Sequence, residues 1–421
     1  MKHALTRRSL LTGATATAAG IGWGTAGTAA AGGRGRPVAQ GAVDAQVARL
    51  EPGLIELRRD IHQHPEAPGQ EQRTAGVVAR ELRAAGLAVT TGVGGHGVVG
   101  VLHGSLPGRT VAYRADMDAV PPGDIVGGGP AAAHLCGHDI HTTVALGVAK
   151  VLARLRRQLS GTVVFLFQPA EEALAGARAM IDAGVLEHTR VEEIHALHCG
   201  PFPVGRFAVT PGYGLPGQDR AEVTLSGPDA PDAARRLAAE IGALATVAPP
   251  QTPADLERMV ADVQTPDGPL ARFVAVRARA QEAKVSVSYR CWPQERYAEV
   301  RADIRRLAMS YAGAGVSFPG EPFPAMVCPE PDARALARHL RRELGGDPVT
   351  ELHAAFPFNG EDFALYLDRV PGTYTFLGVR APGAPITACY PHYPDFLPDE
   401  RAIGVGVRAM AGWVAQRTRG A

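Results

Sequence analysis

Lysine is almost absent from this chain of 421 residues, in which only Lys2, Lys150 and Lys284 occur. Arginine supplies most of the positive charge, and the 43 basic and 42 acidic residues give a formal net charge of +1. A chain so close to neutral has no strong field toward polyanions, so we expect neither nucleic acid nor an anionic membrane as a partner. Long apolar runs are missing too, so we expect no stable insertion into a bilayer.

Cysteine is the second scarce residue. The chain has five, and these are Cys136, Cys199, Cys291, Cys328 and Cys389. Their odd number and wide spacing argue against a disulfide framework. The hydrophobic fraction of 46% and the charged fraction of 20% are typical of a soluble globular protein. The length exceeds what one hydrophobic core usually supports, so we expect two domains.

The amino terminus has the pattern of an export signal. Residues 6–11, Thr-Arg-Arg-Ser-Leu-Leu, resemble a twin-arginine motif, and Ala29-Ala30-Ala31 resembles a signal-cleavage site. The alternative is a disordered basic tail. We assign residues 1–31 to a twin-arginine-type signal peptide and exclude them from the fold. The mature protein is then expected in the periplasm, in the cell envelope or outside the cell.

The rest of the chain predicts an α/β protein. Helix-like spacing of apolar residues over 43–62 and 72–85 is followed by strand-like runs at 87–90, 97–102 and 110–114. A third helix-like run, 142–155, leads to the apolar segment 162–167, which is typical of a buried parallel strand. Strands that alternate with helices indicate a central, mostly parallel sheet flanked by helices.

The pattern changes near Gln218. Strand-like segments at 221–225 and 283–289 alternate with helix-like segments at 233–244 and 295–311, and Pro-rich connections separate them. Beyond residue 324 the alternation of helix-like and strand-like segments seen before residue 218 returns. It predicts a helix over 332–344, a strand over 373–377 and a helix over 403–414. We therefore predict a main domain of residues 32–217 and 325–421, interrupted by a small α+β satellite domain of residues 218–324.

One short stretch concentrates metal-binding side chains. Residues 134–141, His-Leu-Cys-Gly-His-Asp-Ile-His, hold Cys136 and His138 on either side of a glycine. Thiolate and imidazole are strong ligands for zinc and related metals, and this spacing lets both side chains face one ion. The alternative for this stretch alone is a polar loop with a buried structural cysteine.

Two acidic residues and two distant histidines extend this set. Glu171 and Glu172 directly follow the buried strand at 162–167, where one carboxylate can bind a metal while the other accepts a proton from an activated water. A solvated acidic start of a helix is the alternative. His198 lies near an apparent strand end, and His392 lies near the carboxyl terminus. Each histidine taken alone is more often structural than a ligand.

The ordered set resembles the aminoacylase/carboxypeptidase family of dinuclear metallohydrolases, in its branch of hippurate hydrolases and indole-acetyl-amino-acid hydrolases. The resemblance covers most of the mature chain, and further segments carry it. These are Leu-Arg-Arg-Asp-Ile-His at 57–62, Arg-Ala-Asp-Met-Asp-Ala at 114–119, Phe-Gln-Pro-Ala-Glu-Glu at 167–172, Gly-Glu-Asp-Phe at 360–363 and Val-Pro-Gly at 370–372.

The resemblance implies a role for each matching residue. It makes Glu171 the general base, and it makes five residues the ligands of two divalent metal ions, zinc or manganese. These ligands are Cys136, His138, Glu172, His198 and His392. Asp116, Asp118 and Asp139 would orient the ligands. Five further histidines would be structural or would support the ligands, and these are His62, His64, His134, His141 and His195. The implied substrates are N-acyl amino acids or related small amides and peptides, and a homodimer is compatible with the resemblance.

The satellite segment departs from the family pattern. The family carries a Gly-Gly-His-Ala-like turn there, whose histidine stabilises the oxyanion in a partner subunit, but no histidine occurs between Gln218 and Pro324. The matching turn, residues 225–232, reads Leu-Ser-Gly-Pro-Asp-Ala-Pro-Asp, and an Asn-Val-Ile-Pro-like segment is missing near residues 281–285. Two hypotheses follow. The protein is an exported metal-dependent amidohydrolase, with Arg290 as a candidate replacement donor, or it is a catalytically impaired relative that binds metal or small molecules.

Overall fold

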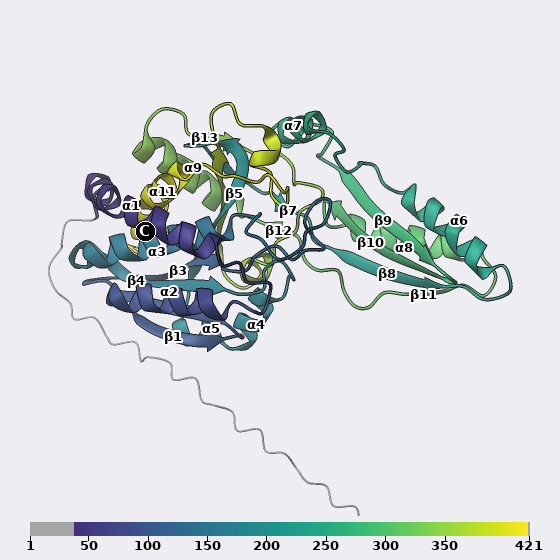
Figure 1. Ribbon diagram of the computed structural model, residues 1–421, viewed down its shortest axis with the longest axis horizontal. Coiled ribbons are helices and arrows are strands. Elements are labelled where there is room, and N and C mark those ends of the chain that lie inside the picture. Colours follow the sequence, from purple (N-terminus) through teal and green to yellow (C-terminus); the bar gives the residue numbers. More distant parts are fainter. Residues whose placement is uncertain (1–37, 420–421) are drawn as a thin grey trace, which may run out of the picture.

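A computed structural model describes residues 38–419 of the chain, so the predicted signal peptide at 1–31 lies outside the described residues. Figure 1 shows a larger main domain and an elongated satellite that projects from it. Each part has its own hydrophobic core. In the described part, no helix has the length and apolar character needed to cross a membrane.

An eight-stranded sheet forms the centre of the main domain. Its strands, in spatial order, are β1 (Ala88–Val93), β2 (Gly97–His103), β4 (Ser160–Gln168), β3 (Leu106–Asp116), β5 (Glu193–Pro203), β14 (Gly372–Arg380), β6 (Phe207–Val209) and β13 (Val349–Glu351). The four strands β4, β3, β5 and β14 run parallel, whereas β1, β2 and β6 each pair antiparallel with a neighbour. The expected α/β class is confirmed. The central strands are buried along most of their length, which explains their nearly continuous apolar sequences.

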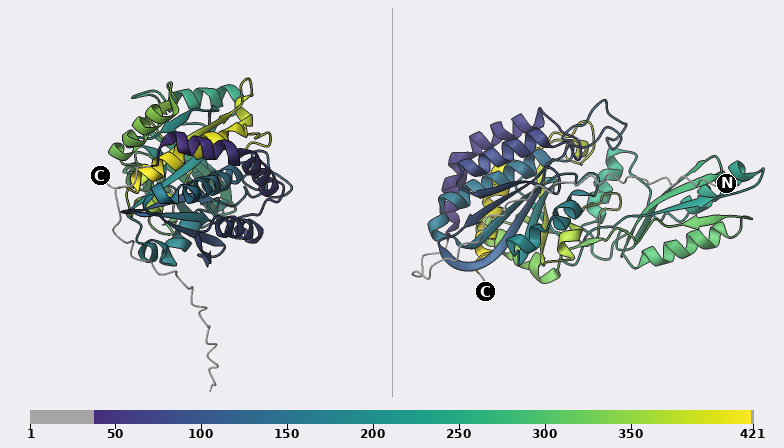
Figure 2. Two further views of the ribbon diagram at one scale, coloured as in Figure 1. Left: turned by 90° about the vertical axis from the view of Figure 1, so that its left-hand side faces the viewer. Right: turned by 90° about the horizontal axis from the view of Figure 1, so that it is seen from below.

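Helices cover both faces of this sheet (Figure 2). One group of mutually contacting helices comprises α1 (Gln40–His62), α2 (Gln72–Ala84), α3 (His138–Arg154), α9 (Glu330–Leu344) and α11 (Arg401–Arg417). The other comprises α4 (Gly176–Asp182), α5 (Val185–Thr189) and α10 (Ala364–Leu367). The chain moves from β3 to β4 through α3 and then back across β3 to β5 through α4 and α5. Right-handed crossovers in opposite directions place the two groups on opposite faces.

The satellite is a four-stranded antiparallel sheet with two helices. Its strands, in spatial order, are β11 (Gly315–Ser317), β8 (Asp219–Thr224), β10 (Lys284–Trp292) and β9 (Phe273–Gln281), and its helices are α6 (Ala230–Gly242) and α8 (Arg296–Ala308). Alternate residues such as Val223 and Val287 are buried in its core, whereas Ser286 and Arg277 are exposed. This alternation is typical of an antiparallel sheet with one covered face.

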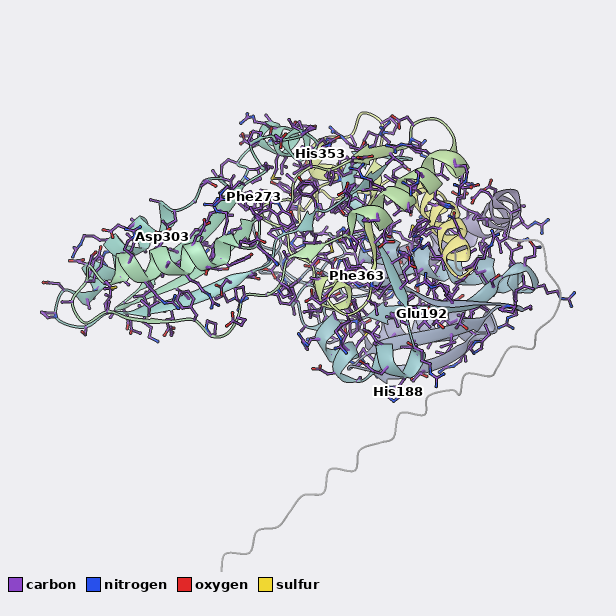
Figure 3. The ribbon with its side chains drawn as sticks, turned by 180° about the vertical axis from the view of Figure 1, so that it is seen from behind. His188, Glu192, Phe273, Asp303, His353 and Phe363 are labelled. Carbon is purple, nitrogen blue, oxygen red and sulfur yellow. The ribbon has the colours of Figure 1, made fainter. Side chains whose placement is uncertain are left out.

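Helix α7 (Pro253–Asp262) lies inside the predicted satellite segment, yet it packs on the main domain (Figure 1). Its buried residues Leu256, Met259 and Val260 belong to the core of the main domain. In Figure 3, Phe273 at the start of β9 and His353 of the main domain both lie near the junction, whereas Asp303 lies out on the satellite. The chain therefore passes between the two parts four times, and α7 fastens the satellite to the main domain. The sequence analysis placed no helix here.

Two polar contacts accompany this packing. Glu257 forms an ion pair with Arg380 at 2.7 Å, and the amide of His353 donates to the carbonyl of Val263 at 2.8 Å. Helix α7 also contacts the short helix η2 (Ile386–Ala388). That helix directly precedes the segment that carries His392, so α7 supports the path of the chain toward that residue.

We predict that Leu256→Ala lowers the free energy of unfolding of the main domain by about 2–5 kcal/mol, because the side chain is fully buried in its core. Urea denaturation measures the change, and hydrogen exchange of residues 386–388 should accelerate. Met309→Ala is the control, because Met309 is 84% exposed and its loss should change stability by less than about 0.5 kcal/mol. Equal effects of the two substitutions would contradict the placement of α7.

Candidate metal centre

A tight turn at the start of α3 places Cys136 and His138 side by side. Gly137 caps the helix with a φ of 92°, a left-handed conformation that favours glycine. A Cβ at this position would also collide with the Cys199 side chain on β5. The helix begins at His138, four residues before the predicted start at 142, so His138 belongs to its first turn and not to a preceding loop. Glycine is thus needed both for the turn and for the close approach to β5.

Three imidazoles share one mode of attachment. The Nδ1 atom of His138 lies 2.9 Å from the carbonyl oxygen of Asp118, that of His198 lies 2.7 Å from the carbonyl of Cys199, and that of His392 lies 3.1 Å from the carbonyl of Asp124. A carbonyl only accepts, so each Nδ1 carries the proton and donates it. In the neutral form of each ring, Nε2 then has a lone pair, and this is the form that binds a metal.

These three Nε2 atoms face Cys136 and Glu172. The Nε2 atom of His198 lies 3.4 Å from Cys136 Sγ, that of His392 lies 3.2 Å from Glu172 Oε2, and that of His138 lies 3.7 Å from Glu172 Oε1. One ligand atom each from Cys136, Glu172 and His392 lies within 4.8 Å of the others. The structure therefore brings all five predicted ligands together. Their roles as ligands stay predictions.

The donor set fits divalent cations. Among residues 38–419, His138 Nε2 and Glu172 Oε1 are buried atoms without a hydrogen-bond partner. A buried polar atom without a partner is costly, and a cation between these two atoms would satisfy both. Sulfur, imidazole nitrogen and carboxylate oxygen together suit zinc and neighbouring transition metals. The residues present thus fit the metal pair that the sequence predicts.

The pKa values in this cluster indicate an excess of negative charge. Burial and the carboxylates of Glu172 and Glu171 raise the pKa of the Cys136 thiol. Although burial lowers the pKa of His138, Asp116 and Asp118 outweigh it and bring the value to about 10. Both groups therefore hold protons that a bound cation would displace, so metal binding should release protons.

Glu171 belongs to the same cluster of side chains. Its Oε2 atom lies 3.8 Å from His138 Nε2, and its carboxylate also groups with those of Glu361 and Asp362. Burial and the neighbouring carboxylate of Glu361 raise the pKa of Glu171 well above its ordinary value. A buried carboxylate with a raised pKa can both accept and return a proton near neutral pH. The geometry is therefore compatible with the predicted general base.

Arg114 neutralises part of this acidic cluster. Its guanidinium, which is 1% exposed, donates to Asp116 Oδ2 at 2.7 Å and to both Glu361 and Asp362 at 3.0 Å. It also donates to Gln168 Oε1 at 3.0 Å. One cation thus joins β3, β4 and the segment before α10. Arg114 and Glu361 belong to two of the motifs found in the sequence. No role was predicted for either residue, because their wide separation in the sequence hides the contact.

The three aspartates predicted to orient ligands do contact the cluster. Asp116 accepts from His141 Nδ1 at 2.6 Å and lies 3.6 Å from His138 Nε2. Asp118 Oδ2 accepts the backbone amide of Glu172 at 2.9 Å. Asp139 pairs with Arg58 at 2.7 Å and with His62 at 2.8 Å, beside the start of α3. They lie next to the predicted ligands, and Asp116 is near enough to belong to one of the groups that could hold an ion.

The other histidines have contacts typical of structural residues. His141 is engaged at both nitrogens, because its Nε2 accepts the Cys199 amide at 2.7 Å. His195 contacts Thr373 Oγ1 at 2.8 Å, and His64 contacts the carbonyl of Asp60 at 2.8 Å. His134 is buried and stacks on the ring of His62. The sequence analysis placed His198 near a strand end, whereas it lies within β5, paired with β14.

The satellite approaches this centre at its root and not at its tip. The turn between β8 and α6, where the family histidine is missing, lies at the end of the satellite farthest from the main domain (Figure 1). At the root, Arg290 of β10 donates to the carbonyl of Gly217 at 3.2 Å and to Gln218 Oε1 at 3.3 Å, and both acceptors are uncharged. Its guanidinium packs directly on Gly360, beside Glu361. Burial lowers the pKa of Arg290, and Tyr297 and Glu171 offset this only in part.

Most of the chain matches known proteins. The profile of peptidase family M20/M25/M40 matches residues 112–416. The chain is 30% identical to N-acetylcysteine deacetylase of Bacillus subtilis, over 85% of this chain and 95% of that protein. It is also 30% identical to the IAA-amino acid hydrolase ILR1-like 5 of Arabidopsis thaliana, over 85% of each chain.

A solved structure extends the comparison. The crystal structure of the YXEP protein of Bacillus subtilis, described as a dinuclear metal-binding peptidase of the M20 family, matches with a TM-score of 0.66 and 29% identity. The match covers 89% of this chain and 99% of that one. The chain therefore belongs to peptidase family M20/M25/M40, and it is a metal-dependent enzyme of the amidohydrolase or peptidase kind.

Proposed function

We propose that this protein is an exported amidohydrolase that cleaves the amide bond of N-acyl amino acids or related small amides and peptides. The observation that carries the proposal is the attachment of His138, His198 and His392 through Nδ1 to backbone carbonyls. This attachment turns three Nε2 atoms toward Cys136 and Glu172. Within residues 38–419, His138 Nε2 and Glu172 Oε1 lack a hydrogen-bond partner, and a purely structural cluster would be more stable with both atoms satisfied.

The five predicted ligands would hold two divalent cations, and zinc or manganese suits their sulfur, nitrogen and oxygen atoms. The cations supply Lewis acidity, which polarises the substrate carbonyl and lowers the pKa of the attacking water. Asp116 and Asp118 keep His138 oriented, since they lie 3.6 Å and 3.3 Å from its two ring nitrogens. A working metal centre requires residues such as these two aspartates, which orient a metal ligand.

Glu171 performs the proton transfers in this proposal. Its carboxylate accepts a proton from the water as that water attacks the carbonyl carbon. It then donates the proton to the nitrogen that leaves, which yields a carboxylic acid and an amino acid. Burial and the neighbouring Glu361 raise the pKa of Glu171, and this makes the carboxyl group able to return the proton to the leaving amine.

Arg290 is the candidate group to bind negative charge on the substrate. Its uncharged hydrogen-bond partners leave its positive charge available, and its guanidinium packs on Gly360, the residue before Glu361. The relatives named as an N-acetylcysteine deacetylase and an IAA-amino acid hydrolase act on substrates that contain an amino acid. A guanidinium suits both the carboxylate of such a substrate and a developing oxyanion.

A catalytically impaired metal-binding or small-molecule-binding protein is the second candidate. The absence of any histidine between Gln218 and Pro324 favours it, because the satellite then lacks the imidazole donor of the family. The presence of Glu171 beside the predicted ligands favours the enzyme, since metal binding alone needs no general base. Hydrolysis of hippurate and N-acetyl amino acids by the metal-loaded mature protein separates the two.

Export rests on the sequence of residues 1–31 alone. We propose that Arg7 and Arg8 direct the folded protein through the twin-arginine route. Folding before export would let the metal centre form while Cys136 is still reduced. Replacement of both arginines by lysine, followed by cell fractionation, tests this part of the proposal. The proposal fails if the double variant is still exported.

We predict that Glu171→Gln abolishes hydrolysis and leaves the metal content nearly unchanged. The amide keeps the shape of the side chain but cannot accept the proton. Cys136→Ala should instead lower the metal content, because it removes a ligand atom. Metal analysis by plasma emission and steady-state kinetics on hippurate measure both effects. Equal loss of metal in the two variants would contradict the separate roles assigned here.

We predict that Arg290→Ala lowers kcat/KM by about 100- to 1000-fold with the metal content preserved, because one donor to developing negative charge is lost. Arg290→Lys should recover part of the activity. Arg277→Ala is the matched control, since Arg277 is an exposed residue on the neighbouring strand β9. Unchanged kinetics in Arg290→Ala would show that another group meets the negative charge.

A further inference from the structure

The turn that carries Glu171 and Glu172 has a strained backbone. Ala170 has a φ of 52°, a left-handed conformation that is costly for any residue with a Cβ. Such a conformation persists only where the surrounding structure enforces it. The carbonyl of Ala170 accepts from the amides of Ala175 and Gly176 at 3.2 Å and 3.1 Å, which fixes the peptide group that follows Ala170. The amide of Ala170 has a different partner.

That partner is Glu71, the residue directly before α2. Its Oε1 atom accepts from the amide of Ala170 at 2.9 Å and from the amide of Gly69 at 2.6 Å. The side chain is fully buried, and its Oε2 atom has no hydrogen-bond partner within residues 38–419. A buried carboxylate without a cationic partner is an expensive way to bind two amides, since a neutral side chain would be cheaper to bury.

Glu71 does not cap helix α2, although an acidic residue directly before a helix often does. The first amides of α2 already have acceptors, because Glu66 accepts from the amides of Arg73 and Thr74 at 2.8 Å each. Glu66 therefore caps the helix. Glu71, one residue before the helix, points away from it and toward the turn at 169–172.

We propose that Glu71 is a positioning residue for Glu171. By holding the amide of Ala170, it keeps that residue in its left-handed conformation and so aims the next side chain into the metal centre. Asp118 holds the following part of the same turn through the amide of Glu172 at 2.9 Å. Two buried carboxylates from different elements thus fix the backbone on both sides of Glu171. This inference rests on the proposed role of Glu171 as general base.

The test compares Glu71→Ala with its neutral isostere and with a matched control. Glu71→Ala should lower kcat by about 10- to 100-fold with little change in KM or metal content, a loss typical of residues that orient catalytic groups. Glu71→Gln should keep most of the activity, because its carbonyl oxygen can accept both amides. Glu66→Ala removes a similar carboxylate that binds two amides of the helix, so it should lower the melting temperature and leave kcat unchanged.

A double variant tests the stated cause. Glycine adopts positive φ without strain, so Ala170→Gly should restore part of the kcat that Glu71→Ala loses. Wild-type kcat in Glu71→Ala, an equal loss of kcat in Glu66→Ala, or no recovery in the double variant would each overturn the inference. Loss of metal from Glu71→Ala in proportion to its activity would do the same.

Hydrogen exchange in the metal-free protein gives a readout that does not depend on hydrolysis. The amide of Ala170 should exchange faster in Glu71→Ala and remain protected in Glu66→Ala. If the wild-type protein hydrolyses none of the tested amides but shows this difference, the proposed function fails while the contact between Glu71 and the turn stands. If the exchange of Ala170 is the same in all variants, the positioning role itself is wrong.

Discussion

The bond from an imidazole Nδ1 to a backbone carbonyl is the interaction on which this metal centre depends. It occurs at His138, His198 and His392, whose carbonyl partners are Asp118 and Asp124 in the loop after β3 and Cys199 in β5. Each bond fixes the direction of the ring and turns Nε2 toward the other predicted ligands. The sheet, the start of α3 and the segment after η2 must all be in place before these rings converge, so the fold and the chemistry of the site are inseparable.

The same site concentrates buried negative charge that the protein alone does not neutralise. The carboxylates gathered there are Asp116, Asp118, Glu171, Glu172, Glu361 and Asp362, and the one buried guanidinium among them is Arg114. Buried charges are tolerated when they are paired or bind metal. The raised pKa values of His138 and Glu171 reflect this imbalance in the absence of a cation. A pair of divalent ions would remove it, which links stability of the centre to metal binding.

The two ends of the satellite differ in their distance from the site. The turn after β8 carries Asp229 and Asp232 where the family has its histidine, and it lies at the far tip (Figure 1). The root, by contrast, brings Arg290 against Gly360, the residue before Glu361, and α7 binds the main domain through Leu256 and the ion pair of Glu257. Contacts from the satellite to the site within one chain can therefore come from the root and not from the tip.

The sequence alone determined the α/β class, the family and the grouping of Cys136, His138, Glu171 and Glu172, because apolar periodicity and short motifs are local properties. It also predicted that His392 joins them, through resemblance and not through spacing. Only the tertiary structure decided which atoms face the cavity, since hydrogen bonds such as those of Arg114 and Glu71 connect residues far apart in the chain. No helix was predicted at α7, although its amphipathic pattern is a local property. Only the folded chain shows that its buried face enters the core of the main domain.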